Sequence, residues 1–523
     1  MAKAKKEKKT KSMEAALWES CNKLRGSVEP AEYKHVVLSL IFLKYAGDRF
    51  EQRKHELEEQ GLQDYISQVE FYTAENVFYL PPTCRWSYIM ENAKQDNIFQ
   101  IIDDALNEIE KKNKQLAGAL PNNYYSNLGL DKTKFASLLD EINKLDTQKD
   151  RDNDLIGRVY EYFLGKFAIA EGKKKGEYYT PKTAVNLITE LIEPYDGKIY
   201  DPCCGSGGMF VQSVKFVEAH GGNQRNVSVY GQENTNTTYK LARMNLAIRG
   251  ISADIKQGDT FLNDQHKDLK ADYIMANPPF NQSEWRDENQ LRTDGRWLGY
   301  DTPPTSNANY GWILHILSKL STNGVAGFLL GNGALTADDG TEFAIRKQLI
   351  EKRKVEAIII LPRDLFYTTD ISATLWILNN NKKARVISKN GQEIHYRDRE
   401  DDILFIDLRR EGDPFEKKYV ELGESLRKRV ADTYHAWQQV GYEDSYHDIP
   451  EFCKSVDIET IREKGYSLFP AKYIEFLNRN ETIDFSTRIK DIQGELSKIL
   501  KEENIQRGQL EELFAHYGLT LNA

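Results

Sequence analysis

Short apolar runs alternate with amphipathic segments between residues 154 and 383, and this alternation constrains the fold more than any other feature. The apolar runs lie at residues 197–200, 227–231, 273–276, 325–330 and 355–361. Segments with helical periodicity lie between most of them, at residues 183–192, 209–219 and 237–248. The alternation predicts an α/β fold with a doubly wound, mainly parallel sheet. Ligands of such folds bind outside the carboxyl ends of the strands, where the motifs described below also fall.

The regions on either side of this pattern have a different character. Residues 1–12 are Lys-rich and predict a disordered tail, whereas residues 13–150 predict an all-α N-terminal domain in which Pro30 starts a helix. Residues 151–475 form the predicted catalytic domain with its C-terminal extension, and residues 476–523 a helical tail. Five apolar residues of that tail are spaced by four and three positions: Phe485, Ile489, Ile492, Leu496 and Ile499. This apolar seam predicts packing on the chain's own body or on a helix of a partner.

Charge and cysteine content exclude some classes of protein. A net charge of −9 argues against a protein that coats nucleic acid by charge alone, but a DNA enzyme with a local basic surface or a basic partner subunit stays open. The five cysteines form an odd, sparse set that predicts a reduced, cytoplasmic protein. Cys203 and Cys204 lack CxxC spacing, so we expect packing there and no metal. The sequence shows no secretory signal and no apolar run long enough to cross a membrane, so we expect no contact with a membrane.

A glycine-rich loop follows the first predicted strand. Residues 201–208 read Asp-Pro-Cys-Cys-Gly-Ser-Gly-Gly, and a predicted helix comes next. Glycines let a backbone turn tightly and approach a ligand closely. The loop lacks the Lys of a phosphate-binding P-loop and the Gly-x-Gly-x-x-Gly spacing of a dinucleotide site. The predicted cofactor contacts of the loop are Asp201, Gly205, Ser206, Gly207 and Gly208.

Polar side chains follow the next two predicted strands. Glu233 and Asn234 come after the strand at residues 227–231, and a carboxylate about 20 residues beyond a glycine loop commonly accepts hydrogen bonds from ribose hydroxyls. Asp259 follows a third predicted strand, where it can accept a hydrogen bond from an adenine amino group. Asp201 suits an amino-bearing or cationic ligand better than a pyrophosphate. This set predicts a nucleoside pocket without a phosphate site, which indicates S-adenosylmethionine as the cofactor.

A tetrapeptide of Asn277, Pro278, Pro279 and Phe280 follows the predicted strand that ends at residue 276. An exocyclic amino group is a poor nucleophile because its lone pair is delocalised into the ring. The Asn277 side-chain oxygen and the Pro278 carbonyl can accept both amino hydrogens, which turns the lone pair toward a methyl donor held in line. Phe280 can stack on a base flipped out of a duplex, a contact worth about 1–3 kcal/mol. The tetrapeptide predicts methylation of an amino nitrogen, and alone it leaves adenine, cytosine and glutamine open as substrates.

With these motifs the sequence resembles the amino-methyltransferases of DNA, and specifically the methylation subunit of type I restriction-modification systems, a gamma-type N6-adenine methyltransferase. Residues 176–181, Gly-Glu-Tyr-Tyr-Thr-Pro, are similar to the family's motif that closes over the methionine end of the cofactor, and they precede the glycine loop as in the gamma-type enzymes. Residues 154–164, 307–312 and 361–366 are similar to further family signatures, the last two read as pocket walls and a strand-turn element. The resemblance implies cofactor contacts by Glu177, Tyr178, Tyr179, Thr180 and Pro181.

The resemblance also implies a reaction and its partners. The chain would transfer a methyl group from S-adenosylmethionine to N6 of an adenine flipped out of double-stranded DNA, protecting the DNA of a prokaryotic host from cleavage. Two such subunits pair with one specificity subunit that reads the DNA sequence, and a translocating restriction subunit completes the nuclease. This sequence contains no Walker motif for a motor, in agreement with that division of roles.

Three other functions compete with this one. A protein-glutamine methyltransferase has a similar tetrapeptide, usually ending in Tyr, whereas Phe280, the helical first region and the motif at residues 176–181 favour DNA. A self-contained adenine DNA methyltransferase would read its target without a partner. A binding module that has lost activity is disfavoured by the intact Asn277.

Overall fold

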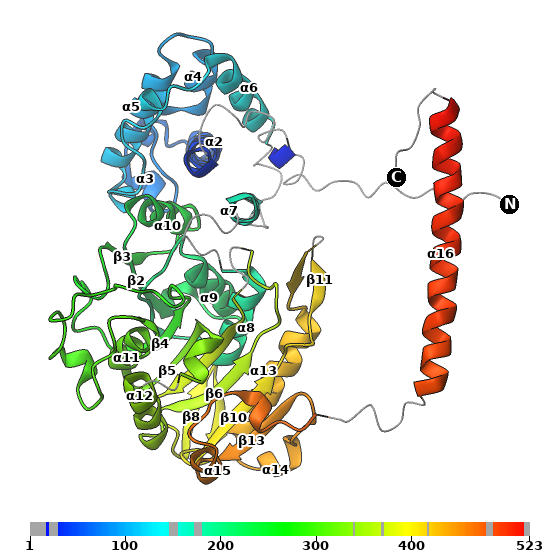
Figure 1. Cartoon of the computed structure of the whole chain (residues 1–523). Helices are drawn as coiled ribbons and strands as arrows, with labels where there is room; N and C mark the ends of the chain where they lie inside the picture. Colours follow the sequence, from blue (N-terminus) through cyan, green and yellow to red (C-terminus); the bar gives the residue numbers. More distant parts are fainter. Residues whose placement is uncertain are drawn as a thin grey trace. The chain divides into compact units, whose positions relative to one another are not determined.

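The computed structural model describes residues 17–19, 30–145, 155–171, 180–337, 340–367, 371–415, 418–476 and 485–516. The chain divides into two units, Met1–Ile474 and Glu475–Ala523 (Figure 1). The tail predicted at residues 1–12 lies outside the described residues. Within the part of the chain that is described, no helix is long and apolar enough to cross a membrane.

Helices make up the first region of the larger unit. They are α2 (Pro30–Glu59), α3 (Glu70–Thr73), α4 (Trp86–Glu91), α5 (Ile98–Lys112), α6 (Lys132–Asn143) and α7 (Leu155–Glu171). Helix α2 begins at Pro30, as the sequence predicts, because the fixed φ of proline suits the first turn and no N–H is needed there. The core of this region extends beyond it, since Leu241, Met244 and Ile248 of α10 (Asn236–Ile248) belong to the same cluster.

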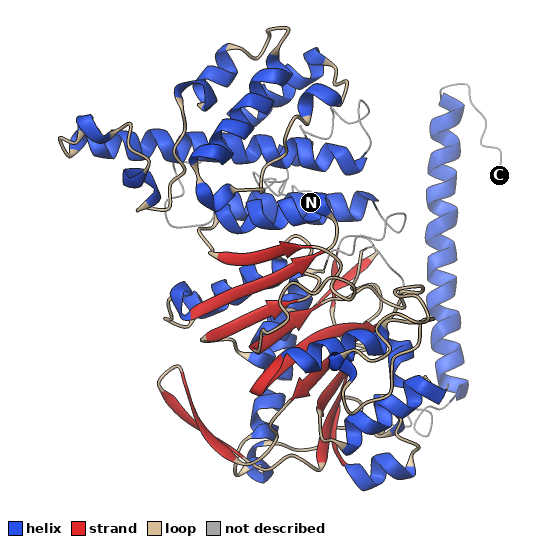
Figure 2. Cartoon of the chain, turned by 90° about the vertical axis from the view of Figure 1, so that its left-hand side faces the viewer, coloured by secondary structure: helices blue, strands red, loops and turns tan. Residues whose placement is uncertain are grey.

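A nine-stranded sheet forms the centre of the second region (Figure 2). Its strands in spatial order are β13 (Cys453–Asp457), β10 (Asp402–Asp407), β6 (Val355–Ile360), β7 (Ala373–Asn379), β5 (Leu320–Gly331), β4 (Ala271–Ala276), β1 (Gly197–Asp201), β2 (Val227–Glu233) and β3 (Ala253–Gln257). Neighbouring strands run parallel except at β7 and β13, which are antiparallel to their neighbours. The prediction of a doubly wound, mainly parallel sheet is confirmed.

Three strands of the sheet were not among the predicted ones. Strand β7 lies between β5 and β6 and is buried at every residue. Its run of Leu375, Trp376 and Ile377 fits a strand covered on both faces, which needs no polar alternation. Strands β10 and β13 come from the extension after residue 384 and continue the sheet beyond β6.

Helices lie on both sides of the sheet (Figure 2). Helices α11 (Asn309–Lys319), α12 (Gly340–Glu351) and α15 (Ile458–Glu463) share a core with Phe328, whereas α8 (Lys182–Ile192) and α13 (Glu424–Gln438) share one with Leu329. Adjacent residues of β5 thus face opposite layers, as the pleat requires. Helices α9 (Gly208–Ala219) and α10 pack on β1 to β3. The remaining α-helix and strands of the larger unit are α14 (Tyr442–Ser445) and the hairpins β8 (Arg385–Lys389) with β9 (Gln392–Tyr396) and β11 (Asp413–Phe415) with β12 (Tyr419–Glu421).

The chain order of the strands reverses at β1. From β1 the chain moves outward to β2 and β3, returns to β4 on the other side of β1, and continues to β5. Strand β1 pairs in parallel with both β2 and β4. In open α/β sheets the crevice outside the carboxyl ends of the strands at such a reversal is the usual ligand site. The glycine loop and the tetrapeptide follow β1 and β4, so the fold places both at this position.

The smaller unit is described over a single helix, α16 (Phe485–His516). The side chains of Ile489, Ile492, Leu496 and Ile499, which belong to the predicted apolar seam, are 50–61% exposed.

Candidate active site

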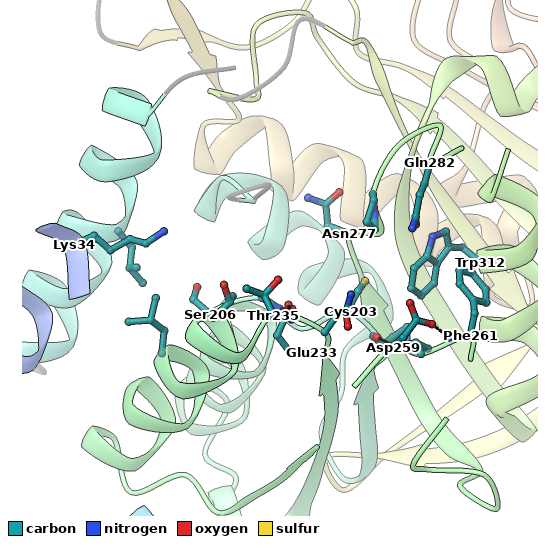
Figure 3. Close-up of a pocket in the computed structure, with 18 of the residues that line it drawn as sticks. Lys34, Cys203, Ser206, Glu233, Thr235, Asp259, Phe261, Asn277, Gln282 and Trp312 are labelled. Carbon is teal, nitrogen blue, oxygen red and sulfur yellow. Dashed lines mark hydrogen bonds between the residues drawn. The ribbon is translucent and has the colours of Figure 1, made fainter. Parts of the chain in front are cut away.

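A cavity of about 230 Å³ lies at the carboxyl ends of β1 to β4 (Figure 3). A second cavity of about 70 Å³ shares five wall residues with it: Leu164, Cys203, Gly205, Ser206 and Asn277. We call these the large and the small cavity. Since they share wall residues, they form one site that joins the glycine loop to the tetrapeptide.

The site brings together most of the residues that the sequence predicts. Those that line one or both cavities are Thr180, Asp201, Gly205, Ser206, Gly208, Glu233, Asn234, Asp259, Asn277 and Pro279. Four described residues lie outside both walls: Pro181, Gly207, Pro278 and Phe280. The remaining three, Glu177, Tyr178 and Tyr179, lie outside the described residues.

The glycine loop is shaped by positive backbone angles. Gly205 has φ 55° and Gly207 φ 79°, a region that L side chains rarely adopt. A Cβ added at Gly205 would meet no atom within 4 Å, whereas one at Gly207 would lie 3.5 Å from Leu246 Cγ. Gly207 therefore faces α10 rather than the cavity, and it caps the start of α9. The loop is anchored by Asn245, whose Nδ2 donates to the Ser206 carbonyl over 2.7 Å.

Asp201 is the buried carboxylate of the site, with an exposed fraction of 2%. Its Oδ1 accepts a hydrogen bond from the Cys203 backbone N–H at 3.0 Å. Burial raises the pKa of Asp201 to about 7. Burial likewise raises the pKa of the Cys203 thiol well above its usual value, so the thiol of the wall stays protonated at neutral pH. A cationic ligand beside Asp201 would favour its ionised form.

Asp259 and a set of aromatic rings form the other end of the large cavity (Figure 3). Oδ1 of Asp259 accepts from the backbone N–H of Phe261 and of Leu262, each at 2.8 Å, which orients its carboxylate. The Phe261 ring lies between Trp285 and Trp312, with 4.3 Å between centroids in each pair. Trp312 Nε1 is buried and has no hydrogen-bond partner among the described residues. This end of the cavity can hold a flat ring that carries polar atoms on its edge.

Asn277 stands where the two cavities meet. Its side chain is 9% exposed, and its Nδ2 donates to Thr180 Oγ1 at 2.9 Å. Its Oδ1 is buried without a partner among the described residues. Such an oxygen is a strong acceptor that awaits a donor, since buried polar atoms are nearly always paired. The loop beyond it is held by Asn309, which accepts from the Asn281 N–H at 3.0 Å.

Phe280 lies apart from the cavity wall. It is 5% exposed, and its ring meets that of Phe366 edge to face, with 5.9 Å between centroids. The predicted stacking of a base on Phe280 stays a prediction.

Several wall residues carry no local signal in the sequence. Lys34 comes from α2, Leu164 and Phe167 come from α7, and Thr238 and Leu241 come from α10. Long-range packing brings these helices to the cavity, and no motif marks them. Phe261 could have been recognised, because it lies two residues after the predicted acceptor Asp259.

Comparisons with known proteins identify the family of the chain. The N-6 DNA Methylase family matches residues 151–482, and the HsdM N-terminal domain matches residues 13–144. The MjaIX type I methylase subunit of Methanocaldococcus jannaschii is 35% identical over 97% of this chain and 92% of its own length. The HindI type I methylase subunit of Haemophilus influenzae is 38% identical over 83% of this chain and 97% of its own length.

Solved structures resemble the fold as well. A type I restriction-modification methyltransferase subunit from Streptococcus thermophilus has a TM-score of 0.72 at 23% identity, over 88% of this chain and 99% of that one. The chain belongs to the N-6 DNA methylase family, among the methylase subunits of type I restriction enzymes, and is an adenine-specific DNA methyltransferase.

Proposed function

We propose that this chain transfers the methyl group of S-adenosylmethionine to N6 of an adenine in DNA, as the modification subunit of a type I restriction-modification complex. The observation that carries the proposal is Asn277 Oδ1 at the end of β4, which is buried and has no hydrogen-bond partner in the described part of the chain. It lies between two joined cavities whose walls include Asp201, Glu233 and Asp259. A buried acceptor at that place suits the amino group of a base that enters the cavity.

The residues present fit S-adenosylmethionine by the chemistry of their donor and acceptor groups. Asp201, Glu233 and Asp259 stand at the ends of three consecutive strands. In that order they suit three parts of the cofactor: its cationic methionine end, its ribose hydroxyls and the amino group of its own adenine. Gly205, Ser206, Gly208 and Asn234 complete the wall, and Gly207 shapes the loop. We also assign to the cofactor the motif of Glu177, Tyr178, Tyr179, Thr180 and Pro181.

The tetrapeptide explains how a weak nucleophile can react. The bound cofactor supplies a methyl carbon made electrophilic by its positive sulfur. Asn277 Oδ1 and the Pro278 carbonyl accept the two amino hydrogens of adenine, which frees the nitrogen lone pair from the ring. Pro278 and Pro279 have no N–H groups, so the backbone there presents only acceptors to the amino group. The nitrogen loses a proton only after it has gained the methyl group, so no basic side chain is needed beforehand.

The proposed partners of the chain are based on its family and on its net charge. We propose that double-stranded DNA presents a flipped adenine, that a specificity subunit selects the site, and that two copies of this chain bind one such subunit. A restriction subunit would complete the nuclease from which methylation protects host DNA. The curated relatives are named as subunits of type I restriction enzymes, and the net charge of −9 fits a chain that shares its DNA contacts. The exposed apolar seam of α16 suits a partner helix.

The test is a methylation assay with radiolabelled S-adenosylmethionine, using this chain alone and co-purified with the products of the neighbouring genes. We expect label in DNA with the complex, at adenines of one sequence and at N6. Site-specific labelling of DNA by the chain alone would favour a self-contained enzyme. Label in a release-factor-like protein but not in DNA would favour a protein-glutamine methyltransferase.

A further inference from the structure

We infer that Thr180 is a positioning residue that fixes the orientation of the Asn277 amide for methyl transfer. The inference rests on the proposed function. The motif at residues 176–181 assigns Thr180 to the cofactor, but the structure gives its hydroxyl a second role. Thr180 Oγ1 accepts a hydrogen bond from Asn277 Nδ2 at 2.9 Å, across 97 residues of sequence.

The orientation of the amide decides what the tetrapeptide can do. With Nδ2 toward Thr180, the carbonyl oxygen Oδ1 remains for the amino group of the substrate. A rotation by half a turn would place the NH2 group of Asn277 against the NH2 group of adenine, two donors face to face. The reaction therefore needs one of two amide orientations that differ little in shape.

The backbone does not select between them. Pro278 and Pro279 fix the main chain after Asn277, but the last torsion of an asparagine side chain is broad and nearly two-fold. The unpaired Oδ1 is itself unfavourable in a buried place, so the amide gains nothing by holding it there. Thr180 provides the only hydrogen bond recorded for the Asn277 side chain in the described part of the chain. A threonine hydroxyl can also donate, so that bond holds the amide in the productive orientation when the hydroxyl proton is given to another acceptor.

The position of Thr180 connects the two halves of the site. Thr180, Asp201 and Asn277 all line the small cavity, where we place the methionine end of the cofactor. A hydroxyl that accepts from Asn277 keeps its own proton for another acceptor. A ligand oxygen that takes this proton would strengthen the bond to Asn277, because hydrogen bonds in a chain polarise one another. Binding of the cofactor would then restrict the rotation of the Asn277 amide, whose Oδ1 accepts from adenine.

The experiment compares Thr180→Val with Thr180→Ser in the full chain, co-purified with its specificity subunit. Valine keeps the shape and removes the acceptor, while serine restores it. In single-turnover methylation at saturating cofactor and DNA, we expect Thr180→Val to slow transfer at least tenfold and Thr180→Ser to stay within threefold of the unchanged protein. Thr183→Val is the matched control, since the Thr183 hydroxyl accepts from the Leu422 N–H instead. If Thr180→Val does not fold, Thr180→Ala takes its place.

A second background separates positioning of Asn277 from contact with the cofactor. An aspartate has two equivalent oxygens and needs no orientation. Adding Thr180→Val to Asn277→Asp should therefore lower the transfer rate by less than threefold. Equal losses in both backgrounds, or a Thr180→Val rate like that of the unchanged protein, would overturn the inference. If Asn277→Asp has no measurable transfer rate, Thr180→Val is judged by two measurements: its transfer rate at saturating cofactor and its cofactor Kd. Weaker cofactor binding with an unchanged transfer rate would overturn the inference. Retained transfer by Asn277→Ala would instead contradict the proposed function.

Discussion

Glu233 accepts the backbone N–H of Gly205 at 3.0 Å, and this bond joins the end of β2 to the glycine loop after β1. The other oxygen of the carboxylate accepts from the Thr235 N–H at 2.8 Å. One side chain thus shapes the loop and lines the large cavity. The site depends on Glu233 for the conformation of the loop as well as for ligand contact.

Changes at Glu233 should separate these two roles. Glu233→Gln keeps an acceptor for Gly205 but loses the charge, and Glu233→Ala loses both. Since a hydrogen bond to a charged group contributes about 1.5–3 kcal/mol, we expect cofactor affinity to fall by roughly 10- to 100-fold in Glu233→Ala and by less in Glu233→Gln. Isothermal calorimetry measures both values. Equal affinities for Glu233→Ala and the unchanged chain would remove this residue from the cofactor site.

Removal of the Asn277 amide should abolish methyl transfer and leave cofactor binding largely unchanged. Asn277→Ala deletes Oδ1, which has no partner among the described residues and which we assign to the adenine amino group. We expect a loss of at least roughly 100-fold in the transfer rate, by analogy with the deletion of one preorganised catalytic hydrogen bond. Cofactor affinity by calorimetry should change little, because the acceptors assigned to the cofactor stay in place.

Cofactor affinity should depend on pH through Asp201. Burial raises the pKa of this carboxyl to about 7, far above its value in an unfolded chain. The cationic cofactor prefers the ionised form, so affinity should fall as the pH drops below about 7, approaching tenfold per pH unit. Asp201→Asn should bind weakly at every pH and flatten the profile. A profile of the unchanged chain that is flat between pH 6 and pH 8 would contradict this role.

The same group should have the opposite effect on the stability of the cofactor-free chain. Because folding raises its pKa, the neutral form of Asp201 favours the folded state, an effect that is fully present below the unfolded pKa near 3.9. The contribution is lost as the pH rises through about 7. Denaturant titrations of the unchanged chain and Asp201→Asn between pH 6 and pH 8 should diverge accordingly.

A side chain at Gly207 should weaken cofactor binding through the backbone. Gly207 has φ 79° and a Cβ there would touch Leu246 without a clash, so the cost is conformational, about 1–2 kcal/mol. In Gly207→Asp the carboxylate would stand at the N-terminus of α9, where negative charge is favourable, so backbone strain sets the expected loss. We expect lower cofactor affinity and a lower midpoint of thermal unfolding. Gly340→Ala on α12 is the control, since its φ is ordinary and its Cβ would meet open space. Unchanged affinity in Gly207→Asp would show that the loop conformation is not needed.

The buried ion pair of Glu356 and Arg399 should govern stability rather than chemistry. Both side chains have an exposed fraction of 0%, and Arg399 Nε lies 2.9 Å from Glu356 Oε1. Glu356→Gln leaves a buried guanidinium without its counter-charge, which costs roughly 3–5 kcal/mol. Chemical denaturation should report this loss, while the transfer rate per folded molecule at low temperature stays near that of the unchanged protein. A transfer rate per folded molecule well below that of the unchanged protein would link this pair to the site.

The sequence predicts those parts of the molecule whose evidence is local. Strands β1, β2 and β4 are contiguous apolar runs, and the chemistry at their ends lies within a few residues of each run, so Asp201, Glu233 and Asn277 could be predicted. The place of β7 between β5 and β6 could not, because pairing partners are distant in sequence. Nor does a motif tell which way a loop residue faces: Gly207 faces Leu246, and Phe280 packs on Phe366. The wall contributed by Lys34, Leu164 and Phe167 depends on packing between whole helices.

Helix α10 belongs to two cores at once. Leu241, Met244 and Ile248 pack among the N-terminal helices, while Ala242 and Leu246 pack against the sheet. A truncation near residue 150 would remove the helices before α7 and expose part of the apolar surface formed by Leu241, Met244 and Ile248. The helical region is therefore not a detachable module: gene fusions or subunit exchanges that preserve activity should carry both regions together.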